Sequence, residues 1–360
     1  MPIVHEWQDS WHAKSHYRND EYLRASIKYV ARKSRLSTNI VRAQCAKCHN
    51  PRISIKVTEG DVIGQAVGIH TAIEGAVKDK TLQEGINCLV CHNIDKIHTK
   101  APISVRGMDR VEWTPNGVMS GPYKDANSPY HKTLYRDFFD KNPNKLCFVC
   151  HANDTSYANK KLFISNMEKE YKGKQKCTEC HMGPKKKGYA ATIPLKNGKK
   201  RSRMVRAHHF KGAHSESMWK KALTLSLRSD KKNVWITIKN PQPHNIPSGF
   251  GGRELLVEVE FYKGTKKIDT KLISLTTYYK RKRLKASTPH MALQKSKELS
   301  VPAKGKKRLK IPKNKEATSM KVTLYYRLVN SEIRKLLRLQ DAIWKKKFYI
   351  TSKSLQLKKH

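Results

Sequence analysis

A five-residue pattern, Cys-x-x-Cys-His, occurs four times in the chain and constrains its fold more than any other feature. The copies are Cys45-Ala46-Lys47-Cys48-His49, Cys88-Leu89-Val90-Cys91-His92, Cys147-Phe148-Val149-Cys150-His151 and Cys177-Thr178-Glu179-Cys180-His181, and together they use all eight cysteines. This spacing is typical of c-type haem attachment, in which two thiols form thioethers with the macrocycle and the next histidine ligates the iron. We therefore predict four covalently attached haem c groups, with His49, His92, His151 and His181 as the proximal iron ligands.

Other uses of paired cysteines explain the pattern less well. A zinc ribbon needs two Cys-x-x-Cys pairs for each metal ion and no histidine directly after each pair. A disulfide scaffold is usually small, whereas this chain has 360 residues. A thioredoxin-like redox pair occurs once, in a strand–helix context. Haem remains the favoured interpretation, with zinc as its main rival.

The composition agrees with a core that contains more than amino acids. Apolar residues make up 38% of the chain, below the range of about 45–50% for globular domains, which also counts glycine. A chain of this length needs a sizeable core to offset its ordering entropy. Four porphyrins would supply apolar surface that the residue count omits.

The location follows from the predicted cofactor, because haem is attached to such motifs outside the cytoplasm. The first residues, Met1 to Trp7, contain neither a basic segment nor an apolar segment of a secretion signal. We expect either that Met1 starts the mature chain or that a leader lies upstream of it. No apolar run approaches eighteen residues, so we predict no membrane span. From the predicted haem attachment we expect a periplasmic or extracellular protein.

Positive charge is concentrated in the second part of the chain. Residues 1–150 hold 22 Lys and Arg against 15 Asp and Glu, and residues 151–360 hold 52 against 14, so the balances are +7 and +38. Basic clusters at 185–187, 280–283 and 304–310 are typical of solvated faces. A field of this size favours acidic partner proteins and contact with anionic surfaces. We predict no specific nucleic-acid binding, because neither a series of stacking aromatic residues nor a known nucleic-acid fold is recognisable.

The hydrophobic pattern changes near residue 220. Alternating apolar residues predict strands around 223–227, 234–238, 255–262 and 320–324. An apolar stripe of Ile333, Leu336, Leu337, Ile343 and Trp344 predicts one amphipathic helix that packs on a core. The fold class is therefore predicted as α+β. A haem-packed, mostly helical and coil domain over 1–220 would precede a small, basic, β-sandwich-like domain over 221–360.

Within the first domain, the patterns are weaker. A helix is expected from Ser10 to about Lys33, and Gly and Pro residues predict a loop over 115–129. The motifs begin 43, 59 and 30 residues apart, which argues against a tandem repeat. The short last interval predicts that the third and fourth haems are neighbours.

Several segments away from the motifs carry a family resemblance. They are Glu6-Trp7-x-x-Ser10-x-His12-Ala13, Gly121-Pro122 with Ser128-Pro129-Tyr130-His131, Arg206-Ala207-His208-His209-Phe210-Lys211-Gly212-Ala213-His214, and Pro243-His244-Asn245-Ile246-Pro247-Ser248-Gly249. With the motifs, they resemble the multihaem cytochrome c family that includes the tetrahaem electron acceptor of hydroxylamine oxidoreductase. They are also similar to tetrahaem cytochromes that polymerise into extracellular conducting filaments. In the last segment the family has Gly-His-x-x-Pro-Thr-Gly, so Pro243 and Ser248 depart from it.

The resemblance implies distal axial ligands among the twelve histidines outside the motifs. It points to His12, His131, His208 and His244, with His214 as a rival of His208. His16 lies one helical turn after His12 and is an alternative to it. His70 and His98, which flank the second motif, are the next candidates, and His290 and His360 are expected to be solvated. Spacing does not pair these histidines with particular irons.

The predicted function is one-electron transfer rather than catalysis, through closely packed haems with two histidine ligands each. The chain would be either a soluble carrier that docks acidic redox partners or a subunit of an extracellular cytochrome filament. In the filament, His5, His12 or His16 would ligate a haem of the adjacent copy. The alternative is an oxidoreductase that acts on a small nitrogen or sulfur compound at a haem with an open axial site. A third possibility is that the β domain binds surface polysaccharide.

Overall fold

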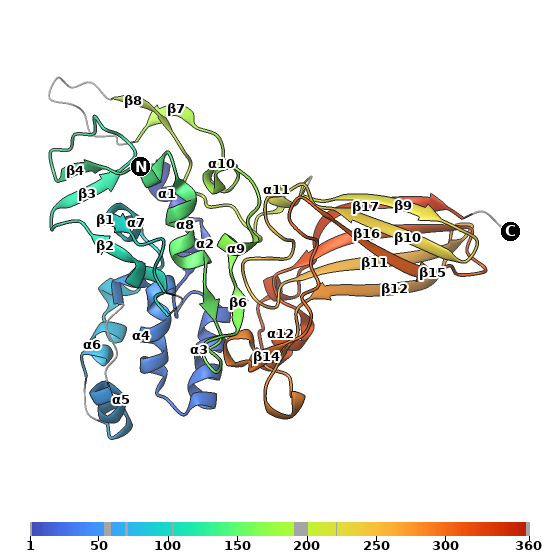
Figure 1. Ribbon diagram of the computed structural model, residues 1–360, viewed down its shortest axis with the longest axis horizontal. Helices are drawn as coiled ribbons and strands as arrows, with labels where there is room; N and C mark the ends of the chain where they lie inside the picture. Colours follow the sequence, from blue (N-terminus) through green and yellow to red (C-terminus); the bar gives the residue numbers. More distant parts are fainter. Residues whose placement is uncertain are drawn as a thin grey trace. The chain divides into compact units, whose positions relative to one another are not determined.

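The computed structural model describes residues 2–53, 59–68, 71–102, 104–190, 201–220 and 222–357. The chain divides into two compact units, which Figure 1 shows in sequence colours. The first unit comprises residues 1–154 and 175–211, and the second comprises 155–174 and 212–360. The sequence instead predicts a single boundary at residue 220. The difference arises because 155–174 packs with the second unit although it precedes the fourth motif.

The first unit consists of short helices and two-stranded ribbons. Its α-helices are α1 Pro2–Gln8, α2 Trp11–Lys14, α3 Glu21–Ser34, α4 Thr38–His49, α5 Glu59–Ala66, α6 Ala72–Lys78, α7 Cys88–His92, α8 Pro143–His151 and α10 Cys177–His181. Its 3-10 helices are η1 Pro51–Ile53, η2 Lys80–Leu82, η3 Gly107–Arg110 and η4 Asp137–Phe139. Its ribbons pair β1 Ile94–Ile97 with β2 Val111–Trp113, β3 Val118–Gly121 with β4 Lys132–Tyr135, and β7 Lys186–Tyr189 with β8 Ser202–Val205.

Two predictions for this unit are wrong in part. The single helix expected over 10–33 is broken, because Ser10 caps α2 and Asp20 caps a separate helix, α3. Each cap accepts a hydrogen bond from a backbone amide three residues on, so each starts a new helix. The loop expected over 115–129 contains β3, which pairs in parallel with β4. Gly and Pro residues around a four-residue strand hid this pairing.

The apolar core of the first unit is divided into small clusters beside the motif helices. One cluster joins α4 to α6 through Ile40, Ala43, Ala46, Ile73 and Val77. Another brings together Val90 of α7, Met108 of η3 and Val149 of α8. Val90 and Val149 lie inside Cys-x-x-Cys-His motifs, so burying them fixes the orientation of those motifs.

The second unit contains two antiparallel sheets. The three-stranded sheet has the order β15-β10-β9, with β9 Thr224–Ser229, β10 Asn233–Lys239 and β15 Lys306–Pro312. The four-stranded sheet has the order β12-β11-β16-β17, with β11 Glu254–Lys263, β12 Lys266–Thr276, β16 Ser319–Arg327 and β17 Phe348–Gln356. Alternate residues of both sheets are buried, among them Ile236 and Val259. This is the β-sandwich arrangement that the period of two predicts, and the four predicted strands are confirmed.

Smaller elements complete the second unit. They are α9 Met167–Glu170, α11 Glu216–Trp219, α12 Ser331–Leu337, the short strands β13 Tyr279–Lys280 and β14 Gln294–Lys295, and the 3-10 helices η5 Lys282–Leu284, η6 Pro289–Met291 and η7 Ala342–Trp344. β5 Asp154–Thr155 and β6 Phe163–Ser165 form a further ribbon. The predicted amphipathic helix is shorter than expected: α12 buries Ile333 and Leu337 and then ends at Arg338, which has a left-handed backbone. None of the helices in the described ranges is long and apolar enough to span a bilayer.

Candidate functional site

Each Cys-x-x-Cys-His motif forms the end of a helix. The motif histidines His49, His92, His151 and His181 are the last residues of α4, α7, α8 and α10. In an α-helix, residues three and four positions apart lie on the same face. The first cysteine of each motif therefore shares a face with the second cysteine and the histidine. Covalent attachment of a haem through two cysteines, with the next histidine as an iron ligand, requires this arrangement.

The Nδ1 atoms of His49, His92 and His181 have hydrogen-bond partners. Nδ1 lies 2.9 Å from Ser15 Oγ in His49, 2.7 Å from the Ser120 carbonyl in His92 and 2.5 Å from the Lys211 carbonyl in His181. A partner at Nδ1 orients the ring and selects Nε2 as the nitrogen for a metal. The ring of Phe139 also stacks on His92, with centroids 5.0 Å apart.

His12 faces the third motif. Its ring centroid lies 6.4 Å from that of His151, and the rings are inclined by 31°. Two imidazoles on opposite sides of one metal ion have centroids about 6 Å apart, because each metal–nitrogen bond is about 2 Å. Burial, and after it the rings of His151 and His181, lower the pKa of His12 to about 3. The ring is therefore a neutral imidazole near pH 7, the form that binds metals.

Contacts to the backbone and to the ring hold His12 in place. The amide of Ile86 donates to the His12 carbonyl at 2.8 Å, and the Trp7 indole donates to the Ile86 carbonyl at 2.7 Å. Gly85 lies so close that a Cβ atom there would be 2.0 Å from the His12 carbonyl oxygen. Phe210 packs on the His12 ring with centroids 4.5 Å apart. These long-range contacts are absent from any local pattern, so the sequence predicted His12 but not its partner.

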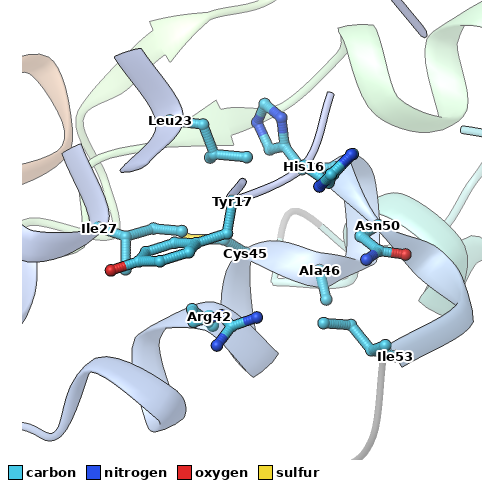
Figure 2. Close-up of a pocket in the computed structure, with 10 residues that line it drawn as sticks. His16, Tyr17, Leu23, Ile27, Arg42, Cys45, Ala46, Asn50 and Ile53 are labelled. Carbon is cyan, nitrogen blue, oxygen red and sulfur yellow. The ribbon is translucent and has the colours of Figure 1, made fainter. Parts of the chain in front are cut away.

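His16 lies beside the first motif, whereas His12 lies beside the third. It lines a pocket together with Cys45, His49, Leu23 and Ile27, and Figure 2 shows the pocket residues from α3 and α4 around it. His16 is only 5% exposed, and burial, followed by the charge of Arg18, lowers its pKa, while Glu84 opposes the shift. The structure thus separates the two N-terminal histidines, which the sequence treated as alternatives for one position.

His131 and His208 both lie within electrostatic range of the second motif. Burial lowers the pKa of His92, and His131 lowers it further, while a hydrogen bond from the ring to the Ser120 carbonyl opposes both. Burial also lowers the pKa of His208, with His92 as the next cause. The Nδ1 atoms of His131 and His208 each lie 3.1 Å from a nearby backbone carbonyl, of Lys132 and Arg206 respectively.

His244 belongs to the second unit, where its loop is firmly held. The side-chain amide of Asn240 donates to the His244 carbonyl at 2.8 Å, and Asn245 Oδ1 accepts from the Ala303 amide at 2.9 Å. The Ile246–Pro247 peptide that follows is cis. His214, the rival of His208, also lies in the second unit.

His98 and His290 lie in different surroundings. His98 forms an exposed contact with Glu112, with Nε2 and Oε1 2.8 Å apart. The prediction that His290 is solvated is wrong, because its ring is partly buried and lies 6.2 Å from that of Phe250. His70 and His360 lie outside the described residues.

The attachment cysteines of all four motifs converge. A hydrogen bond with Cys177, followed by burial, raises the pKa of Cys147, and a hydrogen bond with Cys48, followed by burial, raises that of Cys150. Cys91 of the second motif lies close enough to Cys147 and Cys150 to raise the pKa of each thiol further. Burial raises the pKa of Cys91 to about 12. The third motif therefore touches the first through one cysteine and the fourth through the other. The third and fourth motifs lie side by side, and Asn144 Oδ1 joins their helices by accepting from the Cys177 amide at 2.7 Å. That the haems at these motifs are neighbours stays a prediction.

Two supporting residues were missed from the sequence. Arg110 is 1% exposed and donates to the Phe148 carbonyl at 2.9 Å and the Thr99 carbonyl at 3.2 Å, which ties η3 to the third motif. Gly107 has a positive φ of 56°, and a Cβ atom there would lie 2.7 Å from Cys48 Sγ. A lone buried arginine and a glycine in a polar segment carry no signal of such roles without the fold.

These residues fit covalently bound haem. Thiol pairs share a face with a histidine, the orienting hydrogen bonds are at Nδ1, and one opposing imidazole lies at the separation that an iron atom would need. In residues 2–53, 59–68, 71–102, 104–190, 201–220 and 222–357, no three His, Cys, Asp or Glu side chains form a cluster suited to one metal ion. A zinc ribbon would gather four such ligands.

A buried carboxyl group beside the loop that carries His244 should make the stability of the fold depend on pH. Ser248 donates to Glu170 Oε2 at 2.5 Å, and burial raises the pKa of Glu170 to about 7 from its ordinary 4.5, although the Ser248 bond lowers it. The folded state thus favours the protonated acid, so stability should fall as pH rises from about 4.5 to 7. We expect Glu170→Gln to remove this part of the decline in calorimetric melting of the holoprotein. Glu168→Gln, an exposed change in the same helix, should leave the decline intact, and equal profiles for all three proteins would contradict the prediction.

Comparison with known proteins supports the fold. No family model matches the chain, and no curated protein matches it. Among solved structures, the penta-heme cytochrome c552 from Thermochromatium tepidum is similar, with a TM-score of 0.72 and 15% sequence identity over 99% of this chain and 96% of that chain. The chain therefore has the fold of a multihaem cytochrome c. That protein has five haems, whereas this chain has four attachment motifs.

Proposed function

We propose that the chain is a tetrahaem c-type cytochrome that conducts electrons through closely packed haems with two histidine ligands each. The observation that carries the proposal is the placement of all four motifs at helix ends, with His12 facing His151 across the distance for an axial pair. Each haem iron supplies a one-electron couple when bound. The cysteines fix the position of each group, and the histidines, burial and nearby charge set its potential.

The residue roles follow from the arrangement. Eight cysteines form the thioethers: Cys45, Cys48, Cys88, Cys91, Cys147, Cys150, Cys177 and Cys180. His49, His92, His151 and His181 bind iron from the motif side. We assign His12 to the third motif and His16 to the first, with His131 and His208 as the two candidates for the second. His244 keeps its proposed role as a distal ligand without an assigned motif.

The convergence of the motif cysteines supports conduction. Because Cys48 adjoins Cys150 and Cys147 adjoins Cys177, the third motif connects the first and the fourth. Haems attached at these adjoining cysteines would be close to one another, and short separations between redox groups favour electron transfer. The protein contributes by holding these attachment points at the ends of four helices. It would work in the periplasm or outside the cell, where haem is attached to such motifs.

Spin state tests the proposal against its enzymatic alternative. We expect electron paramagnetic resonance of the oxidised holoprotein to show only low-spin iron, and the reduced spectrum to remain unchanged under nitric oxide. Two imidazoles on every iron leave no position for a substrate or gas. A large high-spin signal that responds to nitric oxide or hydroxylamine would favour the oxidoreductase instead.

The carrier and the filament subunit differ in their N-terminal contacts. Within one chain, His12 faces His151 and His16 lines the pocket of the first motif. Of the three N-terminal histidines proposed for a neighbouring copy, this leaves the exposed His5 on α1, a helix without buried residues. Electron micrographs of the purified holoprotein distinguish the two forms, because only the filament subunit would form long fibres. As a carrier, the protein would dock acidic redox partners.

A further inference from the structure

The outward face of the three-stranded sheet in the second unit carries cations from all three strands. In the antiparallel register, Trp235 of β10 pairs with Arg228 of β9 and Lys310 of β15, and Lys239 pairs with Lys306. Directly paired residues of antiparallel strands project to the same side of a sheet. These residues therefore share one side with Arg308, the partner of Thr237, and we call the set Arg228, Trp235, Lys239, Lys306, Arg308 and Lys310 the basic strand face.

The basic strand face is exposed and has a uniform sign. Its five cations are all solvent-exposed, while the intervening residues Val234, Ile236, Ile238 and Ile311 are buried on the other side. The sequences of the three strands, TLSLRS, NVWITIK and KKRLKIP, contain no Asp or Glu. Among residues 222–357, no carboxylate forms an ion pair with any of these five cations.

The other sheet of the same unit provides the contrast. Its strands also carry basic residues, but acidic side chains on the sheet pair with basic ones. Glu260 pairs with Lys267 at 3.0 Å, Glu258 with Lys347 at 2.9 Å, and Glu254 with Arg327. The four-stranded sheet thus has acidic side chains that neutralise some of its basic ones, and the basic strand face does not. Like charges placed side by side repel one another and lower the stability of the fold. The basic strand face carries this cost, whereas the four-stranded sheet reduces it by pairing basic with acidic side chains.

The row also has a shape. Lys306, Arg308 and Lys310 are alternate residues of one strand, so successive cations are about 7 Å apart along a nearly straight line. The adjacent strand β10 adds Lys239 about 5 Å from Lys306, and Arg228 on β9 lies two strands from the row, about 10 Å away. Trp235 lies within this array, with the Lys310 ammonium 5.3 Å from its ring centroid and its indole nitrogen donating to Asp230 at 2.9 Å. Thr224, Ser226 and Thr237 supply hydroxyl groups on the same side.

We infer that the basic strand face binds a linear acidic polysaccharide and tethers the protein to it. Repeated carboxylates along an extended polymer match a straight row of cations, an indole offers a flat surface for a sugar ring, and the strand hydroxyls can bond to sugar hydroxyls. This role is separate from electron transfer, since all four motifs lie in the first unit and the face lies in the second.

Two other partners fit the face less well. Proteins that bind single-stranded nucleic acid stack successive bases on several aromatic rings, and this face has one. A protein interface usually has an apolar, aromatic centre within a polar rim, whereas here cations surround a single indole. A redox partner is also less suitable, because it would bind to the second unit, whereas all four attachment motifs lie in the first.

Binding of the intact holoprotein to polygalacturonate tests the inference, with neutral dextran as the uncharged control. We expect binding at low ionic strength that weakens as salt is added. The triple variant Arg228→Gln, Arg308→Gln, Lys310→Gln should bind about tenfold more weakly, since it removes three exposed charge contacts. The matched triple variant Lys266→Gln, Lys321→Gln, Lys353→Gln removes the same charge from exposed positions on the four-stranded sheet and should bind nearly as the wild type does.

Further measurements decide the outcome. Unchanged visible spectra and thermal midpoints would show that both triple variants fold and keep their haems, and Trp235→Leu should weaken binding to polygalacturonate while leaving the salt dependence unchanged. Equal losses in the two triple variants would mean that overall charge alone is responsible, and would overturn the inference. Tighter binding of oligothymidylate than of polygalacturonate, or no binding of polygalacturonate at low salt, would overturn it as well.

Discussion

Replacing Cys147 and Cys150 together by serine is expected to remove one haem and to interrupt conduction between the remaining ones. Without thiols the third motif cannot form thioethers, so covalent attachment at that position is lost. The third motif also lies between the first and the fourth, because Cys150 adjoins Cys48 and Cys147 adjoins Cys177. The intact mass should therefore fall by one haem, and pyridine haemochrome assays should give three haems per chain instead of four.

The second motif supplies the matched comparison. Replacing Cys88 and Cys91 by serine should also remove one haem, but it leaves the contacts among the other three motifs in place. We expect flash-induced electron redistribution between haems to slow much more in the variant of the third motif than in that of the second. Four haems retained in either variant would refute thioether attachment. Equal slowing in both would refute the central position of the third motif.

Replacing His12 by methionine is expected to raise the midpoint potential of one haem, by on the order of 0.1 V within the range of about 0.8 V that axial ligands set. A thioether ligand favours the reduced iron more than an imidazole does. His12 is the ring opposite His151, so the effect should be confined to the third motif. Spectroelectrochemical titration would resolve the shifted component from the unshifted ones.

One neighbouring histidine and a second substitution at His12 serve as controls. His5→Ala changes an exposed residue of the same N-terminal segment and should leave all potentials unchanged in the monomer. His12→Ala, which provides no ligand, should instead produce one high-spin iron in the resonance spectrum. If neither His12 variant changes a potential or a spin state, then His12 is not an axial ligand and the proposed pairing fails.

The attachment motifs and four of the seven strands of the two large sheets, β9, β10, β11 and β16, could be predicted because their information is local. Cys147 to His151 is a contiguous signal, and the alternation of Val234, Ile236 and Ile238 is visible within seven residues. β15 was missed although it also alternates, because its exposed positions are Lys306, Arg308 and Lys310. A strand whose outward side is wholly basic has the same composition as a solvated tail.

The motif beside which each of the other histidines lies could not be predicted, because it depends on contacts between distant segments. His12 and His151 are more than a hundred residues apart in sequence, and the Ile86 amide that holds the His12 backbone comes from a third segment. His16 showed no local difference from His12, yet the break between α2 and α3 sends the two rings to different motifs. Tertiary packing decides which motif each histidine lies beside, and the spacing of residues in the sequence does not indicate it.

The passage of residues 155–174 into the second unit affects how the molecule can be dissected. Ser156 Oγ donates to the Ala292 carbonyl at 2.7 Å, and the Tyr157 amide donates to the His290 carbonyl at 2.7 Å. A fragment cut at residue 221 would lack both partners and would expose main-chain acceptors that are normally covered. An autonomous C-terminal piece would therefore need 155–174 grafted back by a linker or added in trans, as in fragment complementation. Moreover, a protease nick between the third and fourth motifs would sever the peptide while leaving the halves bound together.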